Sequence, residues 1–157
     1  MPLDRIGVIV SCPSCGRANR LAFETLAKAA RCGQCQTPLG APSAPIEIED
    51  AATFDAAVAK SALPLVVDFW APWCGPCRMV APELERVARA TAGRYLVVKV
   101  NTDVHQEIGA RLRIQSIPTL AVMAGGREIE RTAGVQPAAA IQAFVDRAVA
   151  SHQRRAS

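Results

Sequence analysis

Two cysteines separated by two residues form the centre of the segment Trp-Cys-Gly-Pro-Cys at positions 73–77. The segment directly follows the apolar run 65–70, which has the length and composition of a buried strand. Residues 77–92 have the pattern of a helix, so free backbone N–H groups and the helix dipole should favour a thiolate at Cys74. Burial should keep Cys77 protonated until a base removes its proton. The spacing therefore predicts a redox couple in which Cys74 attacks and Cys77 resolves.

Asp68 is the one acidic residue within the apolar run 65–70. A buried carboxylate without a partner is costly, so burial should raise the pKa of Asp68. A carboxyl group of raised pKa beneath the cysteines can take the proton of Cys77 during resolution. A local cap or pair, without any role in catalysis, is the alternative.

Four more cysteines near the N-terminus form two further pairs of the same spacing: Cys12, Cys15, Cys32 and Cys35. Sixteen residues separate the pairs, within the range of ribbon-like zinc sites. A block of fewer than 40 residues seldom folds without a crosslink, so we predict one structural Zn²⁺ held by four thiolates. Two structural disulfides, or two further redox pairs, remain as alternatives.

The sequence divides into a zinc-binding module (1–38), a Pro-rich linker (39–45), a main domain (46–150) and a polar, frayed tail (151–157). Two prolines should keep the linker extended, so we expect two bodies with limited contact.

Strands and helices alternate through most of the main domain, which predicts an α/β fold with parallel strands and helices on both faces. Two glycines at 125 and 126 predict an antiparallel hairpin, making the sheet mixed. The expected strands are 46–49, 65–70, 95–101, 119–123 and 128–132, and the expected helices are 50–61, 77–92, 104–112 and 137–150.

Several motifs in combination resemble the thioredoxin family over residues 46–150: Val67–Cys77, Val98–Asn101, Ser116–Thr119 and Gly134. The N-terminal cysteine pairs narrow the resemblance to the zinc-containing bacterial members, the thioredoxin-2 type. The resemblance implies a thioredoxin fold, a central mixed sheet flanked by helices, preceded by a small zinc-ribbon-like module.

The same resemblance implies roles for residues around the cysteines. Lys99 would lie near Asp68 and modulate the behaviour of its carboxyl group. A strand lysine whose ammonium group lies in water, without such a role, is an equal alternative. Pro76 would modulate the couple. The peptide bond before Pro118 would be cis and face the cysteines. A shallow substrate groove would be formed by Trp73, Ile117, Pro118 and Gly134.

These features predict a protein-disulfide reductase. The sequence contains no glycine-rich dinucleotide fingerprint, so we expect no bound organic cofactor and electrons from a partner. By resemblance, that partner is an NADPH-dependent thioredoxin reductase, and the substrates are protein disulfides. One alternative is a thiol oxidase or isomerase, which Gly75 and Pro76 argue against. Another is a zinc-dependent oxidant sensor or partner-binding module.

The formal charge of +4 gives little support for nucleic-acid binding. Much of the basic excess lies in the zinc module, where four thiolates around one Zn²⁺ would largely cancel it.

We expect no membrane partner, because no apolar run approaches the roughly 20 residues needed to span a bilayer. The N-terminus lacks the features of a secretory leader, which predicts a cytoplasmic protein. We also expect a monomer. His105 and His152 are expected on the exposed surface.

Overall fold

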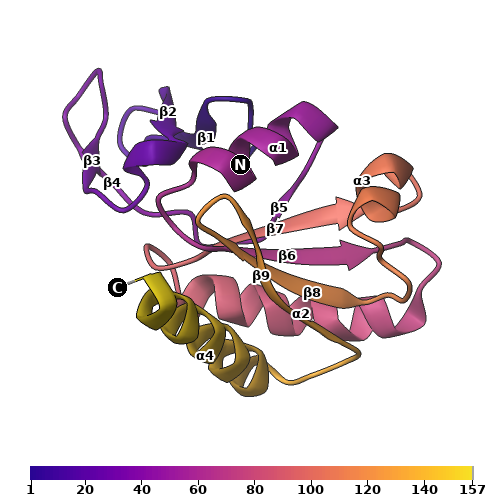
Figure 1. The fold of residues 1–157 in the computed structure, drawn as a ribbon. Coiled ribbons are helices and arrows are strands. Elements are labelled where there is room, and N and C mark those ends of the chain that lie inside the picture. Colours follow the sequence, from indigo (N-terminus) through magenta and orange to yellow (C-terminus); the bar gives the residue numbers. More distant parts are fainter. Residues whose placement is uncertain (157) are drawn as a thin grey trace.

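The computed structural model describes residues 1–156. The N-terminal module consists of two short antiparallel ribbons (Figure 1). One ribbon pairs β1 (Gly7–Ser11) with β2 (Ala18–Ala22), and the other pairs β3 (Ala30–Arg31) with β4 (Pro38–Leu39). A 3₁₀ helix, η1 (Phe23–Thr25), follows β2. Each Cys-x-x-Cys motif lies in the turn of one ribbon, which brings the two pairs into the same part of the module.

Within the described residues, the main domain contains a five-stranded mixed sheet of order β5-β7-β6-β8-β9. The strands β5, β7 and β6 are parallel to one another. Strand β8 is antiparallel to both of its neighbours, β6 and β9, so the sheet is mixed, as the sequence predicts. The strands are β5 (Ile46–Glu47), β6 (Leu65–Trp70), β7 (Leu96–Asn101), β8 (Thr119–Ala124) and β9 (Arg127–Ala133). The helices are α1 (Ala51–Lys60), α2 (Gly75–Ala90), α3 (Gln106–Arg111) and α4 (Ala138–Ala156).

Alternate residues of each central strand point to opposite faces of the sheet. Val67 of β6 belongs to a hydrophobic cluster that includes residues of α1, α3 and the N-terminal module. Val66 belongs to a second cluster with residues of α2 and α4. Figure 1 shows the same layering, with the module and α1 above the sheet and α2 and α4 below it. Asp68 shares the α2 side with Val66, because the two residues lie two positions apart along the strand.

Local signals fix the ends of several elements. The Asp50 side chain caps α1 by accepting a hydrogen bond from the Thr53 backbone N–H at 2.7 Å. Gly125 and Gly126 form the tight turn between β8 and β9 with φ values of +62° and +82°, which confirms the predicted hairpin.

The predicted frayed tail is wrong, because α4 continues to Ala156. Arg154 and Arg155 lie in its last turn, where positive charge interacts favourably with the helix dipole. His152 is half-buried beside the hairpin turn: a Cβ added to Gly125 would lie 3.1 Å from its Nε2. Packing of His152 against the hairpin turn therefore keeps part of residues 151–156 out of solvent, although their polar composition predicts an exposed tail. Ser157 lies outside the described residues.

The expected limited contact between module and main domain is also wrong. Phe23 is fully buried and belongs to the same hydrophobic cluster as Phe54 and Leu63 of the main domain. The backbone N–H of Ala62 donates a hydrogen bond to the carbonyl oxygen of Phe23 at 2.9 Å. The apolar residues of the module thus complete one face of the main core.

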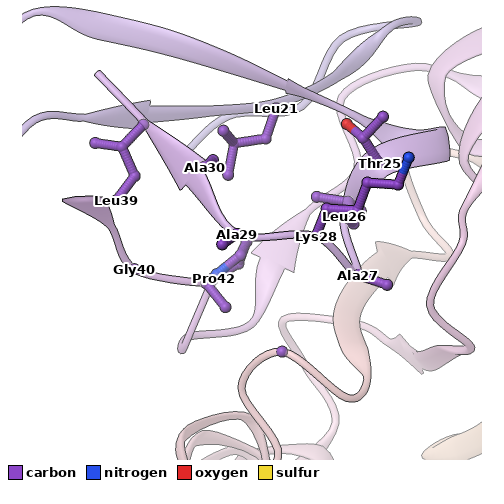
Figure 2. Close-up of a pocket in the computed structure, with 12 residues that line it drawn as sticks. Leu21, Thr25, Leu26, Ala27, Lys28, Ala29, Ala30, Leu39, Gly40 and Pro42 are labelled. Atoms are coloured by element: carbon purple, nitrogen blue, oxygen red, sulfur yellow. The ribbon is translucent and has the colours of Figure 1, made fainter. Parts of the chain in front are cut away.

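The linker is packed as well. Pro42 is buried, and it lines a groove of about 340 Å³ with Leu21 and Leu26 of the module and with Leu39 at the start of the linker (Figure 2). Gly93, in the turn after α2, lines the same groove. The linker therefore connects two contacting bodies rather than acting as a free spacer.

Helix length and composition also bear on membrane association. Among residues 1–156, the helices are all too short or too polar to cross a bilayer.

Candidate active site and metal centre

Cys74 and Cys77 form a disulfide where β6 leads into α2. Cys74 is the N-cap of α2, and the backbone N–H of Cys77 lies 3.2 Å from its Sγ. Both cysteines are only 3% exposed. When the bond is reduced, the same N–H groups and the dipole of α2 favour a thiolate on Cys74. The geometry therefore supports the predicted division into an attacking and a resolving sulfur.

The loop before β8 covers the cysteine pair. The Ile117–Pro118 peptide bond is cis, as predicted. The Ile117 carbonyl oxygen lies 3.8 Å from Cys74 Sγ, and Ile117 and Trp70 pack against the pair. The loop thereby places a backbone oxygen next to the Cys74 sulfur.

The rim of the site is partly apolar and open to solvent. Trp73 is 67% exposed, and its Nε1 donates a hydrogen bond to the Asp103 carboxylate at 3.0 Å. Trp73 and Ile117 line a cavity of about 330 Å³ together with residues of α3. The Gly134 N–H donates a hydrogen bond to the Pro118 carbonyl oxygen at 3.0 Å. Gly134 and Pro118, the other two residues of the predicted groove, are therefore in direct contact. Asp103, which orients the indole, was missed by sequence reasoning because an exposed loop aspartate carries no distinguishing pattern.

Asp68 is 1% exposed, and its Oδ1 has no hydrogen-bond partner within residues 1–156. Burial raises the pKa of Asp68 to about 7, the positive charge of Lys99 opposes this rise, and the negative charge of Glu47 adds to it. Lys99 is its neighbour in register on β7, where the resemblance placed it. A carboxyl group in this state can gain or lose a proton near neutral pH, as a general base or acid requires.

The four cysteines of the module come together at one point, with all their sulfurs within 4.8 Å of one another. The sulfurs are not bonded: Cys12 Sγ lies 3.5 Å from that of Cys35, and Cys15 Sγ lies 3.6 Å from that of Cys32. Four thiolates around a zinc ion at about 2.3 Å would have sulfurs about 3.8 Å apart, so the set fits tetrahedral zinc.

Backbone N–H groups of the ribbon turns also favour thiolates. Ser14 N–H lies 3.4 Å from Cys12 Sγ, and Gln34 N–H lies 3.4 Å from Cys32 Sγ. The N–H groups of Cys35 and Gln34 lower the pKa of the Cys32 thiol to about 6. Metal ligation requires deprotonated sulfur, so these turns are suited to it.

Comparison with known proteins assigns both parts of the chain. Residues 45–147 match the thioredoxin family model, and residues 11–37 match the model described as thioredoxin 2, N-terminal. The chain belongs to the thioredoxin family. It is 36% identical over 147 residues to thioredoxin C-3 of Corynebacterium nephridii, covering 93% of this chain and 99% of that relative.

Other thioredoxins match the main domain. Thioredoxin 1 of a Nostoc species is 45% identical over 95 residues, covering 60% of this chain and 88% of the relative. The crystal structure of chloroplastic thioredoxin z is 38% identical with a TM-score of 0.62, covering 68% of this chain and 96% of that chain. A mutant thioredoxin from Halobacterium salinarum is 26% identical, also with a TM-score of 0.62, covering 69% and 93%.

This thioredoxin is a protein-disulfide reductase with a redox-active pair at Cys74 and Cys77. Members of the family generally reduce protein disulfides, and thioredoxin reductase returns them to the reduced form. The match to the thioredoxin 2 N-terminal family and the four clustered cysteines support zinc binding by the module.

One further residue of this thioredoxin, His105, differs from the sequence-based expectations, and another, Glu47, was not among the predicted site residues. His105 is 7% exposed rather than on the surface, and its Nε2 lies 3.0 Å from the Ile48 carbonyl oxygen. His105 is the N-cap of α3, whereas Ile48 directly follows β5, so this contact between distant segments is invisible in the local sequence. Glu47 accepts a hydrogen bond from Trp70 Nε1 at 3.2 Å, within the neighbourhood of Asp68. Its place in the short strand β5 was the available signal.

Proposed function

We propose that this thioredoxin reduces protein disulfides in two steps. The Cys74 thiolate attacks one sulfur of the substrate disulfide, forming a mixed disulfide and releasing the other substrate sulfur as a thiolate. Asp68 then removes the proton of Cys77, whose thiolate attacks Cys74 Sγ. The Cys74–Cys77 bond forms, the second substrate sulfur leaves, and the substrate has gained the two electrons that the dithiol has lost.

The observation that carries this proposal is the buried Asp68 carboxyl on the strand that leads into the Cys74–Cys77 pair. Its Oδ1 has no internal partner among residues 1–156, and its pKa lies near neutral pH. These properties suit a group that must first accept a proton and later return it to solvent. Lys99 would modulate this carboxyl group, since the two residues are paired in register.

The substrate-binding surface proposed here surrounds Cys74. An extended segment of the substrate would lie against the Ile117 backbone beside the cis-Pro118 bond, and the exposed Trp73 indole and Gly134 would contact its flanks. Pro76, exposed at the start of α2, would restrict the backbone between the cysteines and so modulate the couple.

The partners proposed are protein disulfides as substrates and an NADPH-dependent thioredoxin reductase as electron donor. The setting proposed is the cytoplasm, with the protein acting as a monomer and without nucleic-acid or membrane partners. A reducing compartment suits a dithiol that must be regenerated after each turnover.

We assign the N-terminal module, residues 1–38, one structural Zn²⁺ held by Cys12, Cys15, Cys32 and Cys35. When bound, the ion supplies a crosslink between the two ribbon turns. Residues 39–45 are the linker, and the redox domain begins at residue 46. The redox chemistry requires only the pair in that domain and its surroundings.

The test is the capture of a covalent intermediate. Cys77→Ser should accumulate a mixed disulfide through Cys74, because the first step remains and the second lacks its nucleophile. Cys74→Ser is the matched control, and it should neither form the adduct nor reduce a protein disulfide. Non-reducing gels and intact mass after mixing with a disulfide-containing protein measure both. Normal turnover by either variant would contradict the assignment.

A further inference from the structure

Three charged residues form a row across the sheet next to the active site. Glu47 of β5 is paired in register with Lys99 of β7, and Lys99 is paired with Asp68 of β6. Residues paired across a ladder point to the same face of a sheet, here the face covered by α2. One cation therefore lies between two carboxyl groups.

Trp70 fixes one end of this row. Its Nε1 donates a hydrogen bond to Glu47 Oε2 at 3.2 Å, and Lys99 Nζ lies 4.5 Å from the centroid of its ring. The indole therefore holds both the second carboxylate and the ammonium group, while also packing against the cysteine pair. Asp68 has no equivalent partner for its Oδ1 within residues 1–156.

We propose that Glu47 is a positioning residue that shares the Lys99 ammonium with Asp68, and thereby sets the pH at which Asp68 accepts the proton of Cys77. This inference rests on the proposed role of Asp68 as the base of the second step. It adds to that role a second carboxylate, on β5, two strands away from Asp68.

Other charges face the row from the elements packed against it. Lys99 lines a cavity of about 270 Å³ with Glu85 and Arg89 of α2, and linker residues 43–45 form another wall of that cavity. His105, at the start of α3, acts electrostatically on Glu47. These groups remain in place when Glu47 alone is changed, so a Glu47 variant isolates one charge of the row.

The direction of the expected effect follows from the charges. The Glu47 carboxylate raises the pKa of Asp68 and Lys99 lowers it. Removing the Glu47 charge should lower the pKa of Asp68 directly, and it should also leave Lys99 free to approach Asp68. Two strand spacings separate the carboxyl groups by about 10 Å, where one charge shifts a pKa by about one unit at an effective dielectric of about 20.

The experiment is an NMR titration of the Asp68 carboxyl carbon in the oxidised full-length protein. Glu47→Gln removes the charge but keeps an oxygen that can accept the Trp70 N–H, so it separates charge from packing. We expect the Asp68 midpoint to fall by about 0.5–1 pH unit. Glu49→Gln, an equal change of net charge at an exposed position next to the strand, is the control. A midpoint shift no larger than in that control would overturn the proposal.

Lys99→Met tests the sharing itself. In that background Glu47→Gln should shift the Asp68 midpoint less than it does in the wild type, because only the direct interaction between the carboxylates remains. An undiminished shift would overturn the assignment of Lys99 as the shared cation.

The pH profile of mixed-disulfide resolution separates this inference from the proposed function. A profile that moves with the Asp68 midpoint supports both. A moved midpoint with an unmoved profile supports the charge row, and it removes Asp68 from the second step.

Discussion

The module and the redox domain use the same Cys-x-x-Cys spacing for different chemistry. In the module, each motif lies in the turn of a ribbon, and Cys12 faces Cys35 of the other motif at 3.5 Å. In the redox domain, Cys74 is bonded to Cys77 of its own motif, at the start of a helix. The spacing alone therefore does not determine the function. The element that follows it decides whether the sulfurs face another motif or each other.

Their surroundings differ as well. Two of the module's four cysteines, Cys15 and Cys35, are exposed. Backbone N–H groups lie close to the sulfurs of the other two, Cys12 and Cys32. The redox pair is buried, and the strand β6 that leads into it carries Asp68, a carboxyl group with a pKa of about 7. A metal site needs permanent thiolates, whereas a redox couple needs a thiol that loses its proton only when required.

The largest effect that tests this comparison is removal of the metal. A chelator, or Cys32→Ser, should disorder residues 1–38, because zinc sites of this kind contribute about 10–16 kcal/mol of folding free energy. Losing Phe23 from the shared core should lower the stability of the redox domain. Under conditions where that domain stays folded, the rate of disulfide reduction should stay within about threefold, since the dithiol chemistry needs no metal. Metal content, amide protection in the module and reduction rate are measured on the same samples.

Ser14→Ala is the matched control for this experiment, because Ser14 lies between two ligands and carries no sulfur. It should retain one zinc per chain. A reduction rate that falls in proportion to zinc loss would show that the module supports the active site directly.

Much of the main fold is predictable because its signals are local. The strand 65–70, the Asp50 cap and the glycine turn of the hairpin lie where the sequence places them. The thioredoxin resemblance gave the cis bond before Pro118, which local sequence does not encode. The cysteine pairs were equally readable, since spacing and flanking elements carry their chemistry.

The failures concern contacts between distant segments. Phe23 and His105 are buried by elements far away in sequence, and local composition shows neither contact. The end of α4 followed tertiary contact and helix propensity rather than polarity. Glu47 was not predicted because its proposed role depends on the register between β5 and β7, whose paired residues Glu47 and Lys99 are far apart in sequence.

The second prediction tests the packing of the module on the redox domain. Phe23→Ala should destabilise the protein by about 3–5 kcal/mol, because it opens a cavity in the shared core. Both tryptophans lie in the redox domain, so their fluorescence during urea unfolding reports that domain. Ile6→Ala, at an exposed site of the same module, should change stability by less than about 0.5 kcal/mol. An unchanged fluorescence transition in Phe23→Ala would restore the picture of two independent bodies.

The smallest expected change in stability, and the one most specific to the redox pair, comes from Asp68→Asn. The folded protein holds the Asp68 proton with a pKa of about 7, against about 3.9 in an unfolded chain. The folded state therefore binds more protons between these values, and stability falls as pH rises through that window. Three pKa units correspond to about 4 kcal/mol above pH 7, and an imperfectly bonded buried amide should cancel part of the gain. We expect Asp68→Asn to stabilise the protein by about 2 kcal/mol at pH 8 and by little at pH 4.

The same substitution should slow mixed-disulfide resolution by about 100-fold near neutral pH, because that step loses its base. The first attack by Cys74 should change little, since its thiolate is stabilised by the start of α2. Asp55→Asn, a surface carboxylate paired with Arg111, is the control and should alter neither quantity by more than about 0.5 kcal/mol. Urea unfolding at several pH values and stopped-flow separation of the two steps measure the effects. Equal slowing of both steps, or a stability gain independent of pH, would mean that Asp68 acts through packing, and the contrast between ligand cysteines and redox cysteines would then rest on the helix alone.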